Sequence, residues 1–280
     1  MSDQYTDFSI CYDLFMDNVP YEKWADDIAS ELRRNGIEEG LVLDLGCGTG
    51  TLTELLSDKG YDMIGIDSSE EMLYEAREKQ YERMAGDEGP PGDDKAIEGE
   101  VLDESDDAIA ADVEPEILYL CQDIADFELY GTVRAVVSTC DTFNYLTEPE
   151  QLLKSLKLVN NYLDPDGVLI FDMNAPEKYE EILSDNVFAE NREEASFIWE
   201  NSYDRDSKIN EYALTLFIKD EDTAQYDKSE EYHYQRAYSR DEIKTLLDEA
   251  GFEIIKNFEE DLRMYYVVRV AKGRKLGNIG

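Results

Sequence analysis

Strands and helices alternate along the first half of the chain, and this alternation restricts the fold more than any other feature of the sequence. Leu41–Leu45 has the pattern of a short buried strand, a helix that ends at Gly60 follows it, and Met63–Asp67 is a second strand. Ser68 and Glu71 have the spacing of a capping box, which predicts that the next helix starts there. Strand, helix, strand and helix in this order predict a parallel sheet with right-handed crossovers.

The same alternation continues on both sides of this stretch, so the predicted core extends over most of the chain. The expected elements are a helix at Tyr21–Leu32, strands at 117–120, 135–138 and 168–172, helices at 149–163 and 240–250, a turn at 164–167 and strands at 252–255 and 265–270. We therefore expect residues 1–180 to form the main part of an α/β core with an N-terminal helical lid, and residues 237–280 to complete it.

Two segments depart from this pattern. Residues 85–117 are rich in acids, glycine and proline, which predicts an acidic, mobile insertion. Residues 181–236 contain three expected strands with no helix between them, at Ser196–Asn201, Glu211–Phe217 and Glu230–Gln235. They predict a small antiparallel sheet inserted between the fifth parallel strand and the last helix, which we interpret as a substrate cap.

A glycine-rich motif, Asp44-Leu45-Gly46-Cys47-Gly48-Thr49-Gly50, lies between the first strand and its helix. Glycines at alternate positions let the backbone turn tightly and approach a ligand closely. Asp67 ends the second strand about 20 residues later, which is the spacing of an acid that binds ribose hydroxyls. A dinucleotide fingerprint would have its third glycine where Thr51 stands, so the loop favours another nucleotide cofactor over a nicotinamide.

This motif resembles motif I of the class I S-adenosylmethionine-dependent methyltransferases. Three further segments resemble motifs of the same family in the same order: Gly65–Ser69 with Met72, Cys121–Ile124 after the third strand, and Cys140–Tyr145 after the fourth. The resemblance implies an α/β, Rossmann-like class I methyltransferase core. That core is a mostly parallel seven-stranded sheet with helices on both faces, to which the small inserted antiparallel β-sheet is added.

The resemblance also implies S-adenosyl-L-methionine as the cofactor and a set of residues that bind it. Asp44 would orient the glycine loop or the ligand's ammonium group, Asp67 would bind the ribose, and Asp123 the exocyclic amine of adenine. The implied cofactor-binding residues are Tyr12, Trp24, Asp44, Gly46, Cys47, Gly48, Gly50, Asp67, Ser68, Met72, Gln122, Asp123, Ile124 and Cys140.

Further segments resemble a group of bacterial small-molecule methyltransferases of mostly unassigned substrate, namely Tyr12-Asp13, Val19 to Trp24, Asp141 to Leu146 and Phe171 to Asn174. In that group an N-terminal helix with aromatic residues folds over the cofactor, so Tyr12 and Trp24 are candidates for a lid. The alternative for Trp24 is a core anchor, since tryptophan is usually largely buried.

Methyl transfer from a sulfonium is an in-line displacement, and it needs a base only if the acceptor arrives protonated. His233 is the only histidine, and strand alternation places it with Glu231 and Gln235 on one face. It is a candidate base, the alternative being a structural histidine satisfied by neighbouring acids. Asp141 is the second catalytic candidate, and Asn144 and Tyr145 are candidates for substrate binding.

The charge restricts the partners. The formal net charge is −41, from 67 acidic and 26 basic residues, so the surface would repel nucleic acids and anionic membranes. The same charge suggests a cationic amine as the acceptor. The four cysteines and the single histidine lack metal-site spacing, so we expect no metal. The polar start and the lack of a long apolar run predict a cytoplasmic protein. The oligomeric state has no signature in the sequence.

The sequence thus predicts a methyltransferase that acts on a small molecule by in-line displacement. A non-catalytic S-adenosylmethionine-binding module with a basic protein partner is one alternative, and a nicotinamide-dependent oxidoreductase is another. An enclosed pocket beneath the inserted sheet would favour a metabolite as the acceptor, whereas a wide, open acceptor face would favour a protein.

Overall fold

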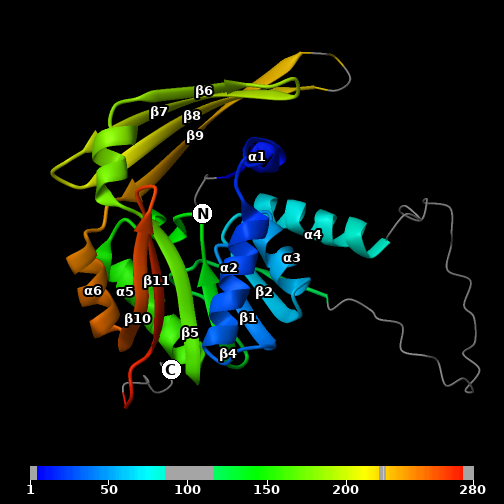
Figure 1. Ribbon diagram of the computed structural model, residues 1–280. Coiled ribbons are helices and arrows are strands. Elements are labelled where there is room, and N and C mark those ends of the chain that lie inside the picture. Colours follow the sequence, from blue (N-terminus) through cyan, green and yellow to red (C-terminus); the bar gives the residue numbers. More distant parts are fainter. Residues whose placement is uncertain (1–4, 86–115, 221–222, 224, 274–280) are drawn as a thin grey trace, which may run out of the picture.

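The computed structural model describes residues 5–85, 116–220, 223 and 225–273. Seven strands form one sheet in the order β10-β11-β5-β4-β1-β2-β3 (Figure 1). Their bounds are β1 Gly40–Leu45, β2 Tyr61–Asp67, β3 Leu118–Cys121, β4 Val133–Ser138, β5 Leu163–Asn174, β10 Phe252–Glu260 and β11 Arg263–Val270. β11 pairs antiparallel with β5 and β10, and the other pairs are parallel, which confirms the mostly parallel sheet.

Helices cover both faces of this sheet. On one face lie α2 (Tyr21–Arg34), α3 (Thr51–Ser57) and α4 (Glu70–Ala85), and on the other α5 (Pro149–Tyr162) and α6 (Arg240–Glu249). Each face has its own buried cluster, with leucines 32, 56 and 73 in the first and Leu156, Val159 and Leu247 in the second. Each such side chain contributes about 1.5–3 kcal/mol when it is fully buried, so the two clusters hold the helices on the sheet.

The inserted segment forms a separate antiparallel sheet, in the order β6-β7-β8-β9, which arches over the core and α1 (Ser9–Phe15) in Figure 1. The strands are β6 Val187–Asn191, β7 Ala195–Asp204, β8 Ile209–Lys219 and β9 Tyr226–Arg236. We expected three strands, and the structure has four in the part that it describes. β6 was missed because it is a short edge strand whose side chains are mostly exposed, so it lacks an alternating pattern.

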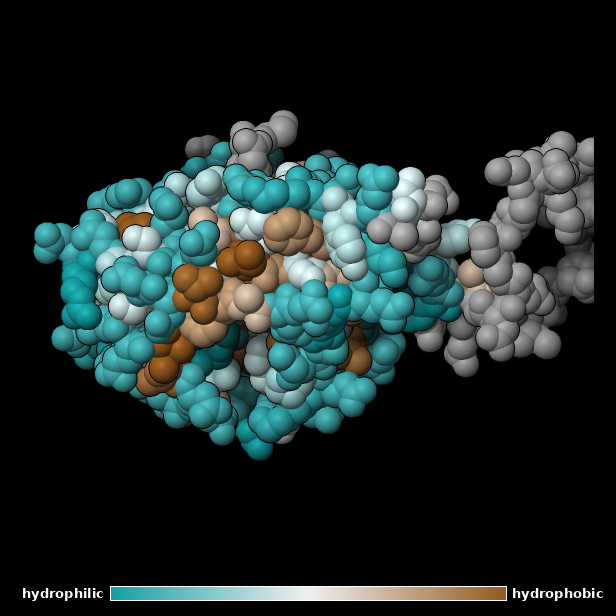
Figure 2. Space-filling model, turned by 90° about the horizontal axis from the view of Figure 1, so that it is seen from above, coloured by the Kyte–Doolittle hydropathy of each residue, from teal (hydrophilic) through white to brown (hydrophobic). Residues whose placement is uncertain are grey.

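The inner face of the inserted sheet packs against the N-terminal helix. Leu214 and Leu216 of β8 form a buried cluster with Cys11 and Phe15 of α1. The outer face carries exposed apolar side chains such as Ile198, and Figure 2 shows hydrophobic residues gathered on the face seen from above. The insert is therefore attached to the core by its inner face and by α1.

Three expectations about local structure need correction or comment. Helix α4 starts at Glu70, and the hydroxyl of Ser69 rather than Ser68 accepts the amide of Met72 at 3.0 Å. The turn expected at 164–167 lies within β5, where the pairing with β4 jumps from Leu163 to Val168. The predicted acidic insertion, residues 85–117, falls almost entirely outside the described residues.

None of the helices in the described ranges is long and apolar enough to cross a membrane.

Candidate cofactor and acceptor site

The glycine loop after β1 presents its backbone to a cavity. The amides of Gly46 and Cys47 donate to the carbonyl of Ile66 at 2.7 and 3.0 Å, which ties the loop to β2. A Cβ on Gly46 would lie 2.3 Å from Thr142 Cγ2, so a side chain has no room there. Gly48 has φ +55°, and a Cβ on it would meet no atom within 4 Å. The loop is therefore packed at Gly46 and open at Gly48, where a ligand can approach the backbone.

Asp67 lies at the end of β2 on the wall of the same cavity. Its Oδ2 accepts the amide of Gly48 at 2.9 Å, and its Oδ1 accepts the amide of Ser69 at 3.0 Å. Burial raises the pKa of Asp67, and these backbone amides partly offset the effect. The two bonds fix the carboxylate, whose remaining lone pairs can accept hydrogen bonds from ribose hydroxyls.

Asp44 lies beneath the loop rather than on the cavity wall. It is buried, and Thr53 of α3 donates its hydroxyl to Asp44 Oδ2 at 2.6 Å. Burial raises the pKa of Asp44 to about 7, with the Thr53 bond opposing the shift and the charge of Asp67 adding to it. These are the contacts of a residue that orients the loop and the start of α3.

Two other residues of the glycine-rich motif, Cys47 and Gly50, face the protein interior. A Cβ on Gly65 would lie 2.9 Å from Cys47 Sγ, so this thiol packs against β2. A Cβ on Gly50 would lie 2.4 Å from Tyr119 Oη, so Gly50 allows this tyrosine to pack at the start of α3. Neither Cys47 nor Gly50 lines the cavity.

The segment after β3 forms the wall opposite the glycine loop. The amide of Gln122 donates to the carbonyl of Asp67 at 2.9 Å, which places the segment beside the end of β2. Asp123 Oδ1 accepts the amide of Ala125 at 2.8 Å, and the Gln122 side chain bonds the backbone of Glu128 at 2.7 and 3.3 Å. The segment is a tight, fixed loop, in which Asp123 keeps its second carboxylate oxygen for a ligand amine.

These elements enclose a cavity of about 580 Å³, which lies within the range of small-molecule sites. Most of the residues implied by the resemblance line it, and Cys121, Thr142, Leu146, Gln151 and Tyr5 line it without having been predicted. The predicted residues on its wall are Tyr12, Gly46, Gly48, Asp67, Ser68, Met72, Gln122, Asp123, Ile124, Cys140 and Tyr145. An open glycine backbone, a fixed carboxylate and the apolar side chains of Met72 and Ile124 fit a nucleoside with a charged tail.

The N-terminal segment covers this cavity. Asp13 of α1 accepts the hydroxyl of Thr49 at 2.7 Å and pairs with Lys79 of α4 at 2.7 Å. The hydroxyl of Ser69 donates to the carbonyl of Tyr5 at 2.8 Å. Tyr12 lies between these two attachments and lines the cavity. Tyr5 was not predicted, because it precedes α1 in a stretch without a periodic pattern.

The backbone after β4 is held in an unusual conformation at the other end of the cavity. Cys140 and Asp141 have φ values of +56° and +53°, and their amides donate to the carboxylate of Asp172 at 3.2 and 2.9 Å. Left-handed conformations are costly for such residues and persist where the surroundings fix them. Cys140 lines the cavity.

Asp141 connects the core to the inserted sheet. Arg263 bridges Asp141, at 2.8 Å, and Asp172, while Gln235 of β9 donates to the other oxygen of Asp141 at 2.6 Å. Burial alone would lower the pKa of Arg263, but Asp172 and Asp141 raise it, so the guanidinium stays charged. Asp141 does not line the cavity, and the catalytic role expected of it stays a prediction.

The two residues predicted to bind substrate lie in different places. Asn144 is fully buried, donates to the carbonyl of Arg236 at 2.8 Å and accepts the amide of Asn174 at 3.0 Å. It joins three elements and does not line the cavity. Tyr145 does line it, and its hydroxyl is hydrogen-bonded to that of Tyr5.

Trp24 lies away from the cofactor cavity. It lines a separate groove of about 210 Å³ between α2 and strands β10, β11 and β5. The guanidinium of Arg263 lies 5.8 Å from its ring centroid, and Tyr21 packs edge-on at 5.6 Å. The contacts of Trp24 are those of a packing residue on this face of the core.

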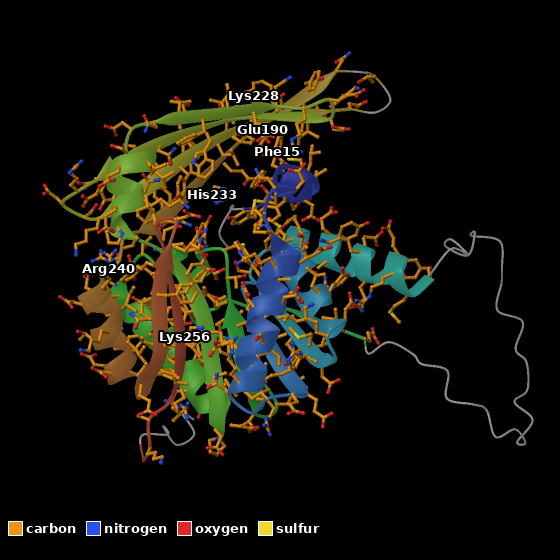
Figure 3. All side chains as sticks on the ribbon, in the orientation of Figure 1. Phe15, Glu190, Lys228, His233, Arg240 and Lys256 are labelled. Atoms are coloured by element: carbon orange, nitrogen blue, oxygen red, sulfur yellow. The ribbon has the colours of Figure 1, made fainter. Side chains whose placement is uncertain are left out.

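His233 lies on the underside of the inserted sheet, facing the core (Figure 3). Glu231, His233 and Gln235 are buried, and Tyr232 and Tyr234 are exposed, which confirms the predicted alternation along β9. His233 Nε2 lies 3.1 Å from Glu231 Oε2. The imidazole does not line the cavity, but the ring of Tyr5, which does, lies 4.6 Å from it between centroids.

The strand order, the glycine loop after β1 and the acid at the end of β2 define a Rossmann-like class I methyltransferase. Residues 16–257 match the family model described as a methyltransferase domain, and the chain belongs to that family. The putative methyltransferase YqeM of Bacillus subtilis is 30% identical over 251 residues, which cover 89% of this chain and 87% of that protein.

A crystal structure of an S-adenosylmethionine-dependent methyltransferase from Clostridium acetobutylicum is also similar. It has 27% sequence identity and a TM-score of 0.76, and the match covers 95% of this chain and 99% of that one. An N,N-dimethyltransferase of a dTDP-linked amino sugar from Streptomyces venezuelae is 27% identical over 168 residues, 59% of this chain and 56% of that protein. The chain is thus an S-adenosylmethionine-dependent enzyme that transfers methyl groups, and neither a nicotinamide oxidoreductase nor a non-catalytic module.

Proposed function

We propose that this enzyme methylates a small molecule that is enclosed between the core and the inserted sheet. The observation that carries the proposal is the way residues 5–15 cover the cavity. Residues 5–15 are hydrogen-bonded to the glycine loop, to the start of α4 and, through Glu231, to β9. A cavity covered by a segment that is fixed at three points suits a metabolite, whereas a polymer needs an open face.

The walls of the cavity suggest how the cofactor lies. Asp67 would bind the ribose and Asp123 the adenine, while the open backbone at Gly48 would receive the methionine part. This orientation directs the methyl group toward Cys140 and Tyr145. The acceptor would then bind beside Tyr145, below the N-terminal segment and the inserted sheet.

An amine is the acceptor class that the charges favour. The formal net charge is −41, and the buried Glu231 and the partly buried Asp141 place carboxylates near the acceptor end of the site. A primary ammonium group is attracted to such surroundings more than a carboxylate or a phosphate is. The relative from Streptomyces venezuelae is named for an amino sugar, which supports the same class.

The test is an acceptor panel of primary amines, alcohols, thiols and carboxylates, with a peptide and an RNA as polymers, in which S-adenosylhomocysteine is measured by mass spectrometry. We expect turnover with primary amines, reduced turnover with Asp67→Asn at subsaturating S-adenosylmethionine, and full turnover with Asp62→Asn, an exposed residue on the same strand. Methylation of the peptide or RNA alone would overturn the small-molecule acceptor. Methylation of neutral or anionic compounds alone would overturn the amine.

We further infer a cytoplasmic location and no nucleic-acid substrate. The first is supported by free thiols at all four cysteines, which suit a reducing compartment. The second is supported by the acidic composition, because nucleic-acid binding requires a basic surface.

A further inference from the structure

The imidazole of His233 is oriented by one carboxylate. Its Nε2 lies 3.1 Å from Glu231 Oε2, and both side chains are buried. Burial alone would raise the pKa of Glu231, but hydrogen bonds from His233, the Phe8 amide and Thr6 lower it below its usual value. The carboxylate is therefore ionised at neutral pH and can only accept hydrogen bonds. The proton of the neutral imidazole consequently lies on Nε2, and Nδ1 carries the lone pair.

This lone pair has no partner. His233 Nδ1 is buried without a hydrogen-bond donor among the residues that the structure describes. A buried acceptor without a partner is destabilising and is uncommon in native proteins. The groups around the ring do not satisfy it: Glu231 bonds Nε2, Tyr5 and Tyr145 bond each other, and Tyr212 of β8, paired with His233, bonds Gln235. With no donor among the described residues, this atom is left to accept a hydrogen bond from a ligand or a water molecule.

Two aromatic side chains that pack on the imidazole ring connect it to the cavity. The ring centroids of Tyr5 and Tyr145 lie 4.6 and 6.2 Å from that of His233, and both tyrosines line the cavity wall. Burial raises the pKa of both hydroxyls, so they stay protonated at neutral pH. His233 thus lies directly behind the wall that Tyr5 forms, at the end where the acceptor binds.

We propose that His233 Nδ1 accepts the proton of the group that is methylated, that Glu231 is its positioning residue, and that the acceptor displaces the ring of Tyr5 to reach it. The proposal rests on the proposed function and narrows its substrate class to molecules with an N–H or O–H at the reacting atom. For an ammonium acceptor, Nδ1 takes one proton, and the nitrogen keeps the electron pair. That pair forms the bond to the methyl carbon as the carbon–sulfur bond breaks, and the bond electrons pass to sulfur. The imidazolium next to Glu231 later releases its proton to water.

The first test is an imidazole ¹⁵N spectrum of the tag-free wild-type protein at neutral pH. Because His233 is the only histidine, the spectrum contains the two nitrogens of one ring. We expect a protonated Nε2 and an unprotonated Nδ1. A proton on Nδ1 would overturn the proposal, because that atom could not then act as a base. This result does not depend on turnover, so it is independent of the acceptor panel.

The second test compares His233→Gln and His233→Asn with the most active primary amine of the panel. The glutamine amide can replace Nε2 and donate to Glu231 but leaves nothing at Nδ1, whereas the asparagine oxygen replaces the acceptor at Nδ1. Loss of a general base costs about 10²–10⁴-fold in kcat. We expect that loss in both variants, with KM for the amine raised in His233→Gln and nearly unchanged in His233→Asn. Tyr232→Phe, on the exposed face of β9, is the control.

The outcomes separate the possible roles. If His233→Gln keeps wild-type kcat while His233→Asn is impaired, the histidine only supports Glu231, and the proposal is wrong. If the wild type methylates amines or alcohols but no carboxylate, whose reacting oxygen carries no hydrogen at neutral pH, the proposal is supported. If the wild type methylates nothing in the panel, the proposed small-molecule acceptor fails, and the nitrogen spectrum alone decides on the base.

Discussion

Glu231 is the buried group on which the position of the N-terminal segment depends most, and Glu231→Gln should loosen that segment. Its Oε1 accepts the Thr6 amide and hydroxyl at 3.1 Å each and the Phe8 amide at 2.9 Å. Its Oε2 accepts the Tyr5 amide at 3.0 Å and faces His233 Nε2 at 3.1 Å. One carboxylate thus holds four donors of residues 5–8 and orients the histidine.

The expected magnitude follows from these contacts. A glutamine can keep its oxygen on the Thr6 and Phe8 side, but its amide hydrogens then meet the Tyr5 amide, so that bond is lost, and the three bonds to Thr6 and Phe8 lose the charge of their acceptor. A hydrogen bond to a charged group contributes about 1.5–3 kcal/mol. A bond to a neutral acceptor contributes only about 0.5–1.5 kcal/mol, so the one lost and three weakened bonds together give about 3 kcal/mol as a lower value, which corresponds to a roughly 100-fold larger open population.

The assay is amide hydrogen exchange of residues 5–15, followed by mass spectrometry. We expect protection of residues 5–8 to fall by about 100-fold and protection of β8 to stay near that of the wild type. Glu230→Gln, the exposed neighbour on the opposite face of β9, is the control and should change neither. If Glu231→Gln leaves the protection of residues 5–8 within threefold of the wild type, Glu231 does not hold the segment.

The remaining predictions concern the loop and its surroundings. In Gly48→Ala the new Cβ enters the open cavity, so the affinity for S-adenosylmethionine should fall at least tenfold by calorimetry, and the free energy of unfolding should fall by about 1 kcal/mol. In Gly46→Ala the new methyl group meets Thr142, so loss of folding should dominate. An unchanged affinity in Gly48→Ala would contradict this loop geometry. Burial raises the pKa of Asp44 to about 7, so above pH 4 the folded state still binds a proton that the unfolded state has lost. The free energy of unfolding of the wild type should therefore decrease between about pH 4 and 7, by up to roughly 1.4 kcal/mol per pH unit. Asp44→Asn should lack this slope in thermal melts. Equal slopes would show that Asp44 titrates normally. Trp24→Leu should lower the melting temperature and leave S-adenosylmethionine affinity within twofold, since Trp24 lines the separate groove; a large loss of affinity would make it part of the cofactor lid.

The parallel core could be predicted because each of its elements has a local signal. β1 and β2 are short apolar runs that end in acids and glycines, and α3, the helix between them, has regular apolar spacing. The glycine loop and Asp67 lie where strand ends meet, so their proximity follows from the topology. The mostly parallel seven-stranded sheet was predicted from the family resemblance rather than from periodicity.

The parts that were not predicted depend on contacts between distant segments. Tyr5 reaches the cavity because Glu231, 226 residues away in the sequence, accepts its amide. Asn144 has the residue type of a substrate ligand, yet its amide joins Arg236 and Asn174 inside the protein. Trp24 was placed on the lid by resemblance, and in the structure it packs beside Arg263. Side-chain chemistry at one position does not reveal which of several buried partners it will meet.

The central claim is that S-adenosylmethionine binds in the cavity between the glycine loop and Asp67. Isothermal titration of S-adenosylmethionine into the wild type, Asp67→Asn and Asp62→Asn tests it most directly. Loss of charge-assisted hydrogen bonds to the ribose costs about 1.5–3 kcal/mol, so binding to Asp67→Asn should be at least tenfold weaker, while Asp62→Asn should bind like the wild type. Equal affinity of Asp67→Asn and the wild type would contradict the account, because the cofactor would then lie elsewhere.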